Sequence, residues 1–350
     1  MSLQKSDTLS TPLHMVEQSH SPEELMACIA LTTDTQEVVD AKIHAISRLG
    51  DFIQEASDGE MNLRWIHCLS ECLKNETHPK VLGHCVGVLG RIRAYGAVPQ
   101  ILDIAIPSKG KTNEVRFFEG VDSSGSDASN IEPPSSDEVL RLRISAVRSL
   151  GRIGDNRAME PLMTLLNDKS ENYRLRLAAT ESLGQLGDDH AVAPLVNLLN
   201  DEWEKSLYIK ESAAKALGML GDIRALEPLI DALESKRGIR DKFNVFKEYI
   251  IEAIGRIGSA GSRKATDSLI AALSDEAPSI RLTAVHALAQ SGEEECLPYV
   301  RESVFDTADD VALAAVDAVF RLGGEEAIRD LLKLENLPKF VRDELESYIP

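Results

Sequence analysis

A short phrase recurs six times in the second half of this chain, and its spacing constrains the fold more than any other feature. The clearest copies read Leu-Gly-Arg-Ile-Gly-Asp, Leu-Gly-Gln-Leu-Gly-Asp and Leu-Gly-Met-Leu-Gly-Asp, and they begin at residues 150, 183 and 217. The last glycines of the six copies, which lie 33, 34, 37, 34 and 31 residues apart, are Gly154, Gly187, Gly221, Gly258, Gly292 and Gly323. A period of this size indicates a stack of helical pairs in which each repeat contacts only its neighbours.

The residues around one of these glycines show how a repeat folds. Apolar residues recur every three or four positions from Leu175 to Leu186, which is the stripe of one helix, called helix B below. Gly187 suits the left-handed end of that helix, and Asp188 can cap the helix that follows. Pro194 fits the first turn of this following helix, helix A, where a missing N–H costs little. The sequence therefore predicts an all-α fold, an α-solenoid (superhelix) of about eight short helical-pair repeats.

The repeat frame also divides the chain into parts. Gly90 and Gly151 occupy the same position of the frame but are 61 residues apart, about 27 more than one repeat. The surplus is rich in Ser, Pro and Gly, which is typical of a loop. We predict a disordered N-terminus over residues 1–20, N-terminal helical repeats over 21–106, an acidic Ser/Pro/Gly-rich insertion loop over 107–137, the main repeat array over 138–324 and C-terminal capping helices over 325–350.

The charge balance excludes several classes of partner. The formal net charge is −19, whereas DNA or RNA binding needs a basic surface that neutralises phosphates, and anionic membranes are disfavoured for the same reason. No apolar run is long enough to span a membrane, and the polar N-terminal segment lacks the apolar core of a signal peptide. Five cysteines at irregular spacing do not look like a disulfide framework. We therefore expect a cytoplasmic protein with reduced thiols.

The repeat itself resembles a known family. The pattern Val/Ile/Leu-Arg-x-x-Ala-x-x-x-Leu-Gly-x-Ile-Gly-Asp, followed by x-x-Ala-x-x-Pro-Leu-x-x-Leu-Leu, resembles the short HEAT-like repeat, and more closely the phycobilisome-lyase type of HEAT repeat. The resemblance is clear over residues 139–324 and weaker over 36–106. It implies an α-solenoid scaffold and, for the lyase type, proteins that handle open-chain tetrapyrroles. Deoxyhypusine hydroxylase is a HEAT-repeat enzyme that binds iron through His-Glu pairs, and this chain has no His-Glu dipeptide.

A basic residue stands eleven positions before five of the repeat glycines. These residues are Arg143, Arg176, Lys210, Lys247 and Arg281. One interpretation is a ladder of ligand-binding cations. The other is a structural ladder, because HEAT-type repeats often pair such an Arg with an Asp in the turn between helices A and B. Asp168, Asp201 and Asp275 stand in those turns, so we favour the structural ladder.

The functional surface is expected on helix B, because repeat proteins commonly bind extended partners on their concave face. Positions five and nine after the basic residue lie on one helix face, four residues apart. In the main array they are Arg148 and Arg152, Glu181 and Gln185, Lys215 and Met219, Glu252 and Arg256, His286 and Gln290, and Asp317 and Arg321. They are mostly polar and differ between repeats, which suits either partner binding or a solvated surface.

A second candidate site is the connection between helix A and helix B at residues 235–244, which explains the one spacing of 37 residues. Its cations form the most basic patch of this acidic chain, and aromatic residues lie near it in the sequence. The candidates are Lys236, Arg237, Arg240, Lys242 and Tyr249, with Trp203 and Tyr208 in the preceding repeat. Such a patch suits an acidic partner or a carboxylate-bearing ligand, or it is a charged surface loop.

Metal and catalytic signatures are weak in this sequence. Cys68 and Cys72 share a helix face, and Cys85, His67 and His84 lie near them in the sequence. Zinc sites usually have Cys-x-x-Cys in a turn, which is absent, and buried free cysteine is common, so we predict no metal site. No nucleophile–base motif, phosphate loop or paired-carboxylate signature is found, and we predict no catalytic residue.

Two functions follow as hypotheses. The first is a noncatalytic scaffold or adaptor that binds a protein partner on its concave face and needs no cofactor. The second rests on the resemblance alone: a bilin lyase, a lyase subunit or a chromophore chaperone that binds a bilin transiently and attaches it to a cysteine of a phycobiliprotein. The partner would then be a phycobiliprotein or a second HEAT-repeat subunit, and nucleic acid is expected in neither case.

Overall fold

The computed structural model describes residues 21–31, 35–55, 59–107, 135–236, 243–258 and 262–349, together with the single residues 13, 16 and 19. Every regular element in these residues is a helix. Contact clustering divides the chain into two compact units, residues 1–186 and residues 187–350, which are called the first and the second unit below.

The helices alternate between types A and B, as the repeat frame predicts. The B helices are α3 (Gln36–Glu55), α5 (Pro79–Arg91), α8 (Ser136–Ile153), α10 (Tyr173–Leu186), α12 (Leu207–Leu220), α14 (Asn244–Ile257), α16 (Pro278–Ser291) and α18 (Asp309–Leu332). The A helices are α2 (Pro22–Ile29), α4 (Gly59–Asn75), α6 (Val98–Ala105), α9 (Met159–Asn167), α11 (Val192–Asn200), α13 (Leu226–Ser235), α15 (Arg263–Ala272) and α17 (Leu297–Glu302). The described residues thus contain eight A–B pairs, and the expected α-solenoid is confirmed.

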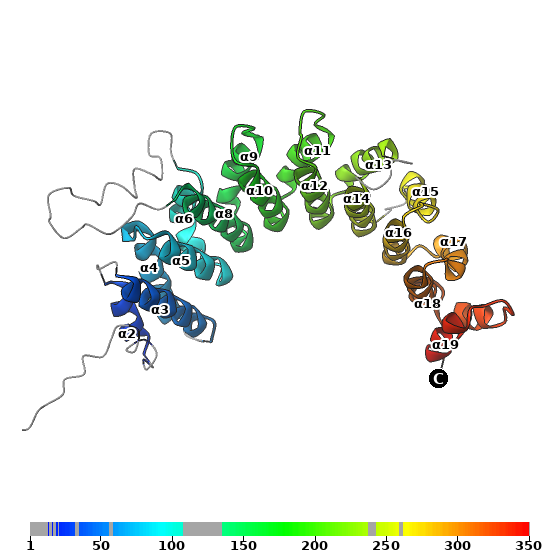
Figure 1. The fold of residues 1–350 in the computed structure, drawn as a ribbon, viewed down its shortest axis with the longest axis horizontal. Coiled ribbons are helices and arrows are strands. Elements are labelled where there is room, and N and C mark those ends of the chain that lie inside the picture. The colour runs from blue at the N-terminus through cyan, green and yellow to red at the C-terminus, as the bar shows by residue number, and fades with distance from the viewer. Residues whose placement is uncertain are drawn as a thin grey trace, which may run out of the picture. The chain divides into compact units, whose positions relative to one another are not determined.

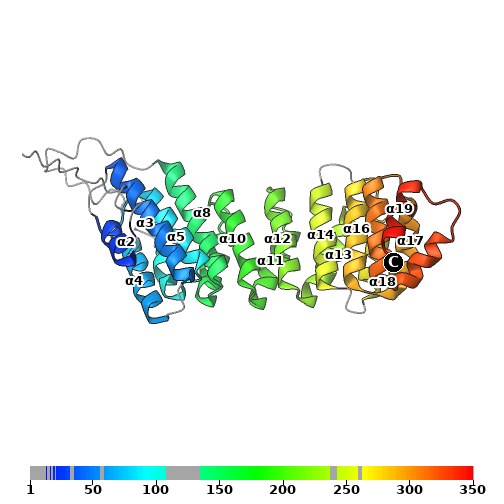
Figure 2. The same ribbon diagram turned by 90° about the horizontal axis from the view of Figure 1, so that it is seen from below.

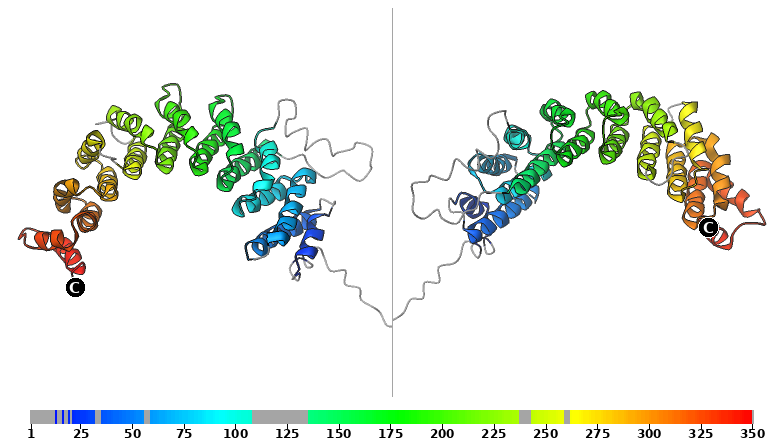
Figure 3. Two further views of the ribbon diagram at one scale, coloured as in Figure 1. Left: turned by 180° about the vertical axis from the view of Figure 1, so that it is seen from behind. Right: turned by 45° about the horizontal axis from the view of Figure 1, so that its top comes forward.

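Short 3₁₀ turns and one further helix complete the described part of the chain. The turns η1 (Tyr95–Ala97), η2 (Asn156–Ala158), η3 (Asp189–Ala191), η4 (Ile223–Ala225) and η5 (Glu294–Cys296) lead into A helices, and η6 (Ser303–Phe305) follows α17. Helix α19 (Lys339–Ser347) packs on α18 at the C-terminal end. Within each unit the B helices lie side by side in one layer and the A helices in the other (Figures 1 and 2). Figure 3 shows these layers from two further sides.

Several neighbouring B helices approach closely because a glycine lies at their crossing. A Cβ atom on Gly151 of α8 would lie 2.8 Å from the backbone Cα of Ser182 on α10, closer than real Cβ contacts allow. Gly90 of α5 meets Ser149 of α8 in the same way, at 2.7 Å. Helices α5 and α8 therefore pack directly, although residues 107–137 separate them in the sequence.

The turn from helix B to helix A follows the predicted Gly-Asp logic. Gly221 ends α12 with φ of 67°, a conformation that glycine adopts without steric cost. Asp222 then accepts a hydrogen bond from the backbone N–H of Arg224 and caps the next turn. In the last repeat the positive φ falls on Gly324 and not on the predicted Gly323, so the expectation for Gly323 is wrong: α18 continues through Gly323 and kinks one residue later.

Candidate functional site

The column of basic residues forms ion pairs between successive repeats. In the first unit the Lys42 ammonium lies 2.8 Å from a Glu76 carboxylate oxygen, and Arg143 lies 2.7 Å from Glu171. In the second unit Lys247 lies 3.2 Å from Asp275, and Arg281 lies 2.6 Å from Asp306. Each carboxylate belongs to the turn before the next B helix, so each pair links two repeats.

The identity of these partners corrects the predicted pairing. Asp275 was expected to pair with Arg281 of its own repeat, but its carboxylate pairs with Lys247 of the preceding one. Arg281 instead donates to the backbone carbonyl of Asp275 at 3.0 Å. Arg176 donates likewise to the Leu166 carbonyl, 2.9 Å away at the end of helix A. Leu166 lies in the last turn of α9, so Arg176 satisfies a carbonyl that the helix end leaves without a partner.

Each acidic residue of the ladder also orders its own turn. Glu76 accepts from the backbone N–H of Thr77 at 2.8 Å and of His78 at 2.9 Å, directly before α5 begins at Pro79. Burial raises the pKa of Glu76, but hydrogen bonds from Lys42 and from this backbone outweigh it and lower the pKa. The ladder is therefore a structural device that joins a B helix to the turn of the following repeat.

Lys210 differs from the other cations of the ladder in its electrostatic surroundings. Burial, followed by the nearby Lys236 ammonium, lowers the pKa of Lys210 below its usual value. The turn that would supply its acidic partner, by the spacing of the other repeats, contains residues 237–242, which lie outside the described residues.

The predicted face of the B helices is exposed to solvent. Arg148, Arg152, Gln185, Lys215, Met219, Arg256, His286 and Gln290 are exposed, whereas Glu181 and Glu252 are half-buried. Side chains at equivalent positions meet across neighbouring helices, since Arg148 lies 3.4 Å from Glu181. Within α14, Arg256 pairs with Glu252 at 2.6 Å. Apart from the apolar Met219, these positions of the face are polar.

The second candidate site is only partly described. Trp203, in the turn between α11 and α12, is 83% exposed, and Tyr208, which was expected in that turn, lies in the first turn of α12 and is 68% exposed. The ammonium of Lys236 lies 5.1 Å from the ring centre of Phe243. Tyr249 is half-buried on α14, and the Lys215 ammonium lies 5.9 Å from its ring centre. Arg237, Arg240 and Lys242 lie outside the described residues.

Two cysteines of the first unit, Cys68 and Cys85, lie in surroundings that favour the neutral thiol. Burial raises the pKa of Cys68 to about 11, and the buried Cys85 has its pKa raised by a hydrogen bond with Cys72 and by burial. The Cys85 thiol donates to the Leu69 carbonyl at 3.3 Å. Because the thiolate is the form that binds metals and attacks electrophiles, these surroundings oppose both roles.

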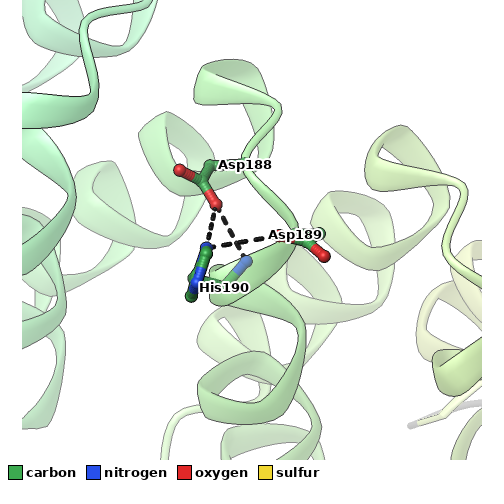
Figure 4. Close-up of side chains that lie close together, drawn as sticks. All are labelled: Asp188, Asp189 and His190. Carbon is green, nitrogen blue, oxygen red and sulfur yellow. Dashed lines mark hydrogen bonds and ion pairs between the residues drawn. The ribbon is translucent and has the colours of Figure 1, made fainter.

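One cluster was not identified from the sequence. Among the described residues, Asp188, Asp189 and His190 form the group whose potential metal-ligating atoms lie within 4.8 Å of one another (Figure 4). Asp188 accepts from the backbone N–H of His190 at 2.9 Å and lies 2.7 Å from its Nδ1. The hydrogen bond to Asp188 raises the pKa of His190. Asp189 pairs with Arg224 at 2.9 Å, so the cluster is the ordinary turn cap of this repeat, with His190 where other repeats have Arg.

A cavity of about 710 Å³ in the second unit was not predicted either. Leu233, Ile251 and Ile280 contribute apolar wall, and the ladder pair of Lys247 and Asp275 borders it. Lys264 of the wall lies 2.9 Å from both Glu227 and Asp231. Both lysines of the wall, Lys247 and Lys264, therefore already have acidic partners.

Comparisons with known proteins concern the fold. A family model described as HEAT repeats matches residues 135–208, 169–242, 237–319 and 266–347. No curated protein matches the sequence significantly. Among solved structures, importin beta is 13% identical with a TM-score of 0.54, and the match covers 93% of this chain and 45% of that one. This likeness shows the fold alone.

Two further structures are less similar in shape. The complex of CpcE and CpcF of phycocyanin lyase from Nostoc sp. PCC7120 is 16% identical over 95% of this chain and 96% of that one, with a TM-score of 0.36. Human deoxyhypusine hydroxylase is 17% identical over 86% and 96%, with a TM-score of 0.33. The expected HEAT-like repeat is confirmed by the family model, and no statement about activity follows from these two structures. Among the described residues, no helix is long and apolar enough to cross a membrane.

Proposed function

Because the chain belongs to the family of HEAT-repeat proteins, we propose that it is a noncatalytic scaffold that binds a protein partner on the exposed face of its B helices. One observation carries the proposal. Arg143, Lys247 and Arg281 of the ladder form ion pairs between repeats, whereas residues five and nine positions later in the frame, such as Arg148 and Lys215, are exposed to solvent. A surface whose chemistry varies from repeat to repeat suits recognition of an extended partner.

The test uses the full chain with one charge reversed at a time. Arg148→Glu, Lys215→Glu and Arg256→Glu change the proposed face, and Arg263→Glu on helix α15 is the matched control, since Arg263 is 93% exposed on the other layer. Partners are captured from native extract and identified by mass spectrometry, and the affinity of the purified partner is then measured for each variant. Loss of affinity in at least one face variant, with the control unchanged, is expected. Equal affinity for all four proteins would overturn the proposal.

A second proposal is that the chain handles a bilin, as a lyase, a lyase subunit or a chromophore chaperone acting on phycobiliproteins. The observation that favours it is the aromatic surface of α12 and α14, where Tyr208 is exposed and Lys215 lies over the ring of Tyr249. Aromatic rings stack on conjugated ligands, and an ammonium group pairs with carboxylates such as bilin propionates. Titration with biliverdin should shift the visible absorption band, and Tyr249→Ala should abolish the shift. An unchanged spectrum with the wild-type chain, alone and in the captured complex, excludes this proposal.

The partner under the second proposal is a phycobiliprotein or a second HEAT-repeat subunit. The scaffold proposal places the protein in the cytoplasm, where its five free cysteines would stay reduced.

A further inference from the structure

The B-helix face of the first unit gathers cations, although the whole chain has a net charge of −19. Three of its four B helices, α5, α8 and α10, repeat one pattern of exposed positions, spaced so that they share a helix face. Six cations occupy this pattern and are called the basic face below: Lys80, Arg91, Arg141, Arg148, Arg152 and Arg174. All six side chains are exposed. No cation of the basic face belongs to the ion-pair ladder.

Contacts between neighbouring helices show that equivalent positions lie next to each other. Arg91 lies 3.2 Å from Asp51, the equivalent residue of α3, and Arg148 lies 3.4 Å from Glu181, the equivalent residue of α10. The tight crossing at Gly90 brings α5 and α8 together in the same way. The cations therefore form columns: Lys80, Arg141 and Arg174 in one, and Arg91 and Arg152 in another.

These columns are incompletely neutralised by the protein itself. Arg141 pairs with Asp137 on its own helix, and Arg148 pairs with Glu181. Lys80 and Arg152, by contrast, have no ion-pair partner among the described residues. Arg91 likewise pairs with Asp51, so the ion pairs of the folded chain account for three of the six cations and leave Lys80 and Arg152 unexplained.

Gly87 supplies an independent observation. It lies in the middle of the exposed face of α5, between Lys80 and Arg91, and nothing lies within 4 Å of the place where its Cβ would be. Glycine inside a helix costs about 0.5–1 kcal/mol relative to alanine. Gly90, three residues later, has a packing reason, because Ser149 fills the space beside it. No neighbouring group among the described residues requires a glycine at position 87 for packing. The absence of a side chain there leaves the backbone of α5 accessible to a bound molecule.

We infer that the basic face binds an acidic, extended segment of the protein partner, with Arg148 and Arg152 pairing with its carboxylates and Gly87 allowing its backbone to lie close to α5. This rests on the proposed scaffold function and names the chemistry of the partner. Arg is suited to the role because its planar fork binds a carboxylate through two parallel hydrogen bonds. Three helices roughly 9 Å apart make a face roughly 18 Å wide, which an extended segment of about six residues spans.

An acidic polypeptide fits this surface better than a nucleic acid. The net charge of −19 repels a long polyanion at a distance, whereas a short segment meets only the local field. Asp51, Asp137 and Glu181 interrupt the cations, so the face offers separate binding positions for carboxylates and not the continuous track that a phosphate backbone needs.

The experiment measures binding of fluorescein-labelled decaglutamate to the full chain by fluorescence anisotropy. The double variant Arg148→Glu/Arg152→Glu should weaken binding by about 30-fold, because two attractions become repulsions. Arg263→Glu/Arg329→Glu, which reverses two exposed cations of the second unit outside the predicted face, is the charge-matched control and should leave binding within about twofold. Gly87→Gln should weaken binding by about tenfold without lowering the melting temperature, because its side chain enters open space and improves helix propensity. If Gly87 were needed only for folding, Gly87→Gln would lower the melting temperature and leave binding unchanged.

The remaining outcomes each decide the question. If decaglutamate does not bind, or binds the Arg148→Glu/Arg152→Glu variant as well as the wild type, the inference is wrong, while partner capture through Lys215 would still support the scaffold. Tighter binding of a single-stranded DNA decamer than of decaglutamate would identify a nucleic acid site and overturn it. If sedimentation shows salt-sensitive self-association that the double variant abolishes, the occupant is a second copy of this chain and the inference of a foreign segment fails.

Discussion

Replacement of Lys42 by methionine tests the ladder at its most buried pair. The side chains of Lys42 and Glu76 are only 4% and 5% exposed, and their charged atoms are 2.8 Å apart. Lys42→Met preserves the length of the side chain but leaves the Glu76 carboxylate buried without its counter-charge. Removing one partner of a buried pair costs about 3–5 kcal/mol, so we expect a loss of that size in the free energy of unfolding. For a unit of this size the melting temperature should fall by about 10 °C.

The assay is urea denaturation of the full chain followed by circular dichroism at 222 nm. The double variant Lys42→Met/Glu76→Gln should recover most of the lost stability, because Gln still accepts from the Thr77 and His78 amides and no charge is left buried. Arg141→Met is the control, since Arg141 is 75% exposed in its pair and should cost less than about 0.5 kcal/mol. The reasoning is refuted if Lys42→Met costs no more than this control, or if the double variant loses the sum of both single changes.

The same pair predicts a dependence on pH. The pKa of Glu76 is lower in the folded chain than its ordinary value of 4.5. The pair therefore contributes its full stability above about pH 4.5, and this contribution is lost as the pH falls through the lower folded-state pKa. Acid titration of the unfolding free energy should show a decrease in wild type that is smaller in the Lys42→Met/Glu76→Gln variant.

Three further changes probe the repeat frame. Gly151→Ala forces a Cβ within 2.8 Å of the Ser182 Cα and should lower the unfolding free energy by about 1–3 kcal/mol, measured by urea denaturation; an unchanged value would contradict the close crossing. Gly221→Ala requires alanine at φ of 67° and should cost about 1 kcal/mol in the same assay, whereas a stabilised variant would show that the turn tolerates a side chain. The folded-state pKa of His190 should exceed 6.5 in an NMR titration and fall in Asp188→Asn; its contribution to stability is present below pH 6.5 and lost as the pH rises through the folded pKa, and an equal pKa in both proteins would contradict the cap.

The helices could be predicted because their signals are local. The apolar stripe from Leu175 to Leu186, the glycine after it and the capping aspartate all lie within one repeat. The spacing of the stripe predicts the helix, and the glycine and aspartate predict where it ends. The prediction misplaced the break in the last repeat because Gly323 and Gly324 are adjacent and either can end a helix. The structure assigns the positive φ to Gly324, and a Cβ on Gly323 would lie 2.6 Å from that of Ala327.

The partners of the ladder could not be predicted from spacing. Asp275 stands six residues before Arg281 and 28 residues after Lys247, and the shorter separation suggested the wrong partner. The stacking of the repeats determines the partner. The turn before a B helix lies beside the preceding B helix, so the Asp275 carboxylate reaches Lys247. Arg281 instead donates to the backbone carbonyl of Asp275 in its own turn. A contact between repeats becomes visible only when the stacking of the repeats is known.

The basic face could not be recognised in the sequence for a related reason. Its cations on α5 and on α8 are 61 residues apart because the insertion separates them, so no window of the sequence contains both Arg91 and Arg152 as neighbours. Arg143 and Arg148 also look alike in the sequence, yet Arg143 is consumed by Glu171 and the end of α6, while Arg148 faces solvent beside Glu181. Position in the frame, and not residue type, separates the arginines that stack the repeats from those exposed to solvent. A chain built on this rule can change the exposed positions of each repeat while the pairs that stack it stay in place, and under the proposed function those exposed positions are the ones available to a partner.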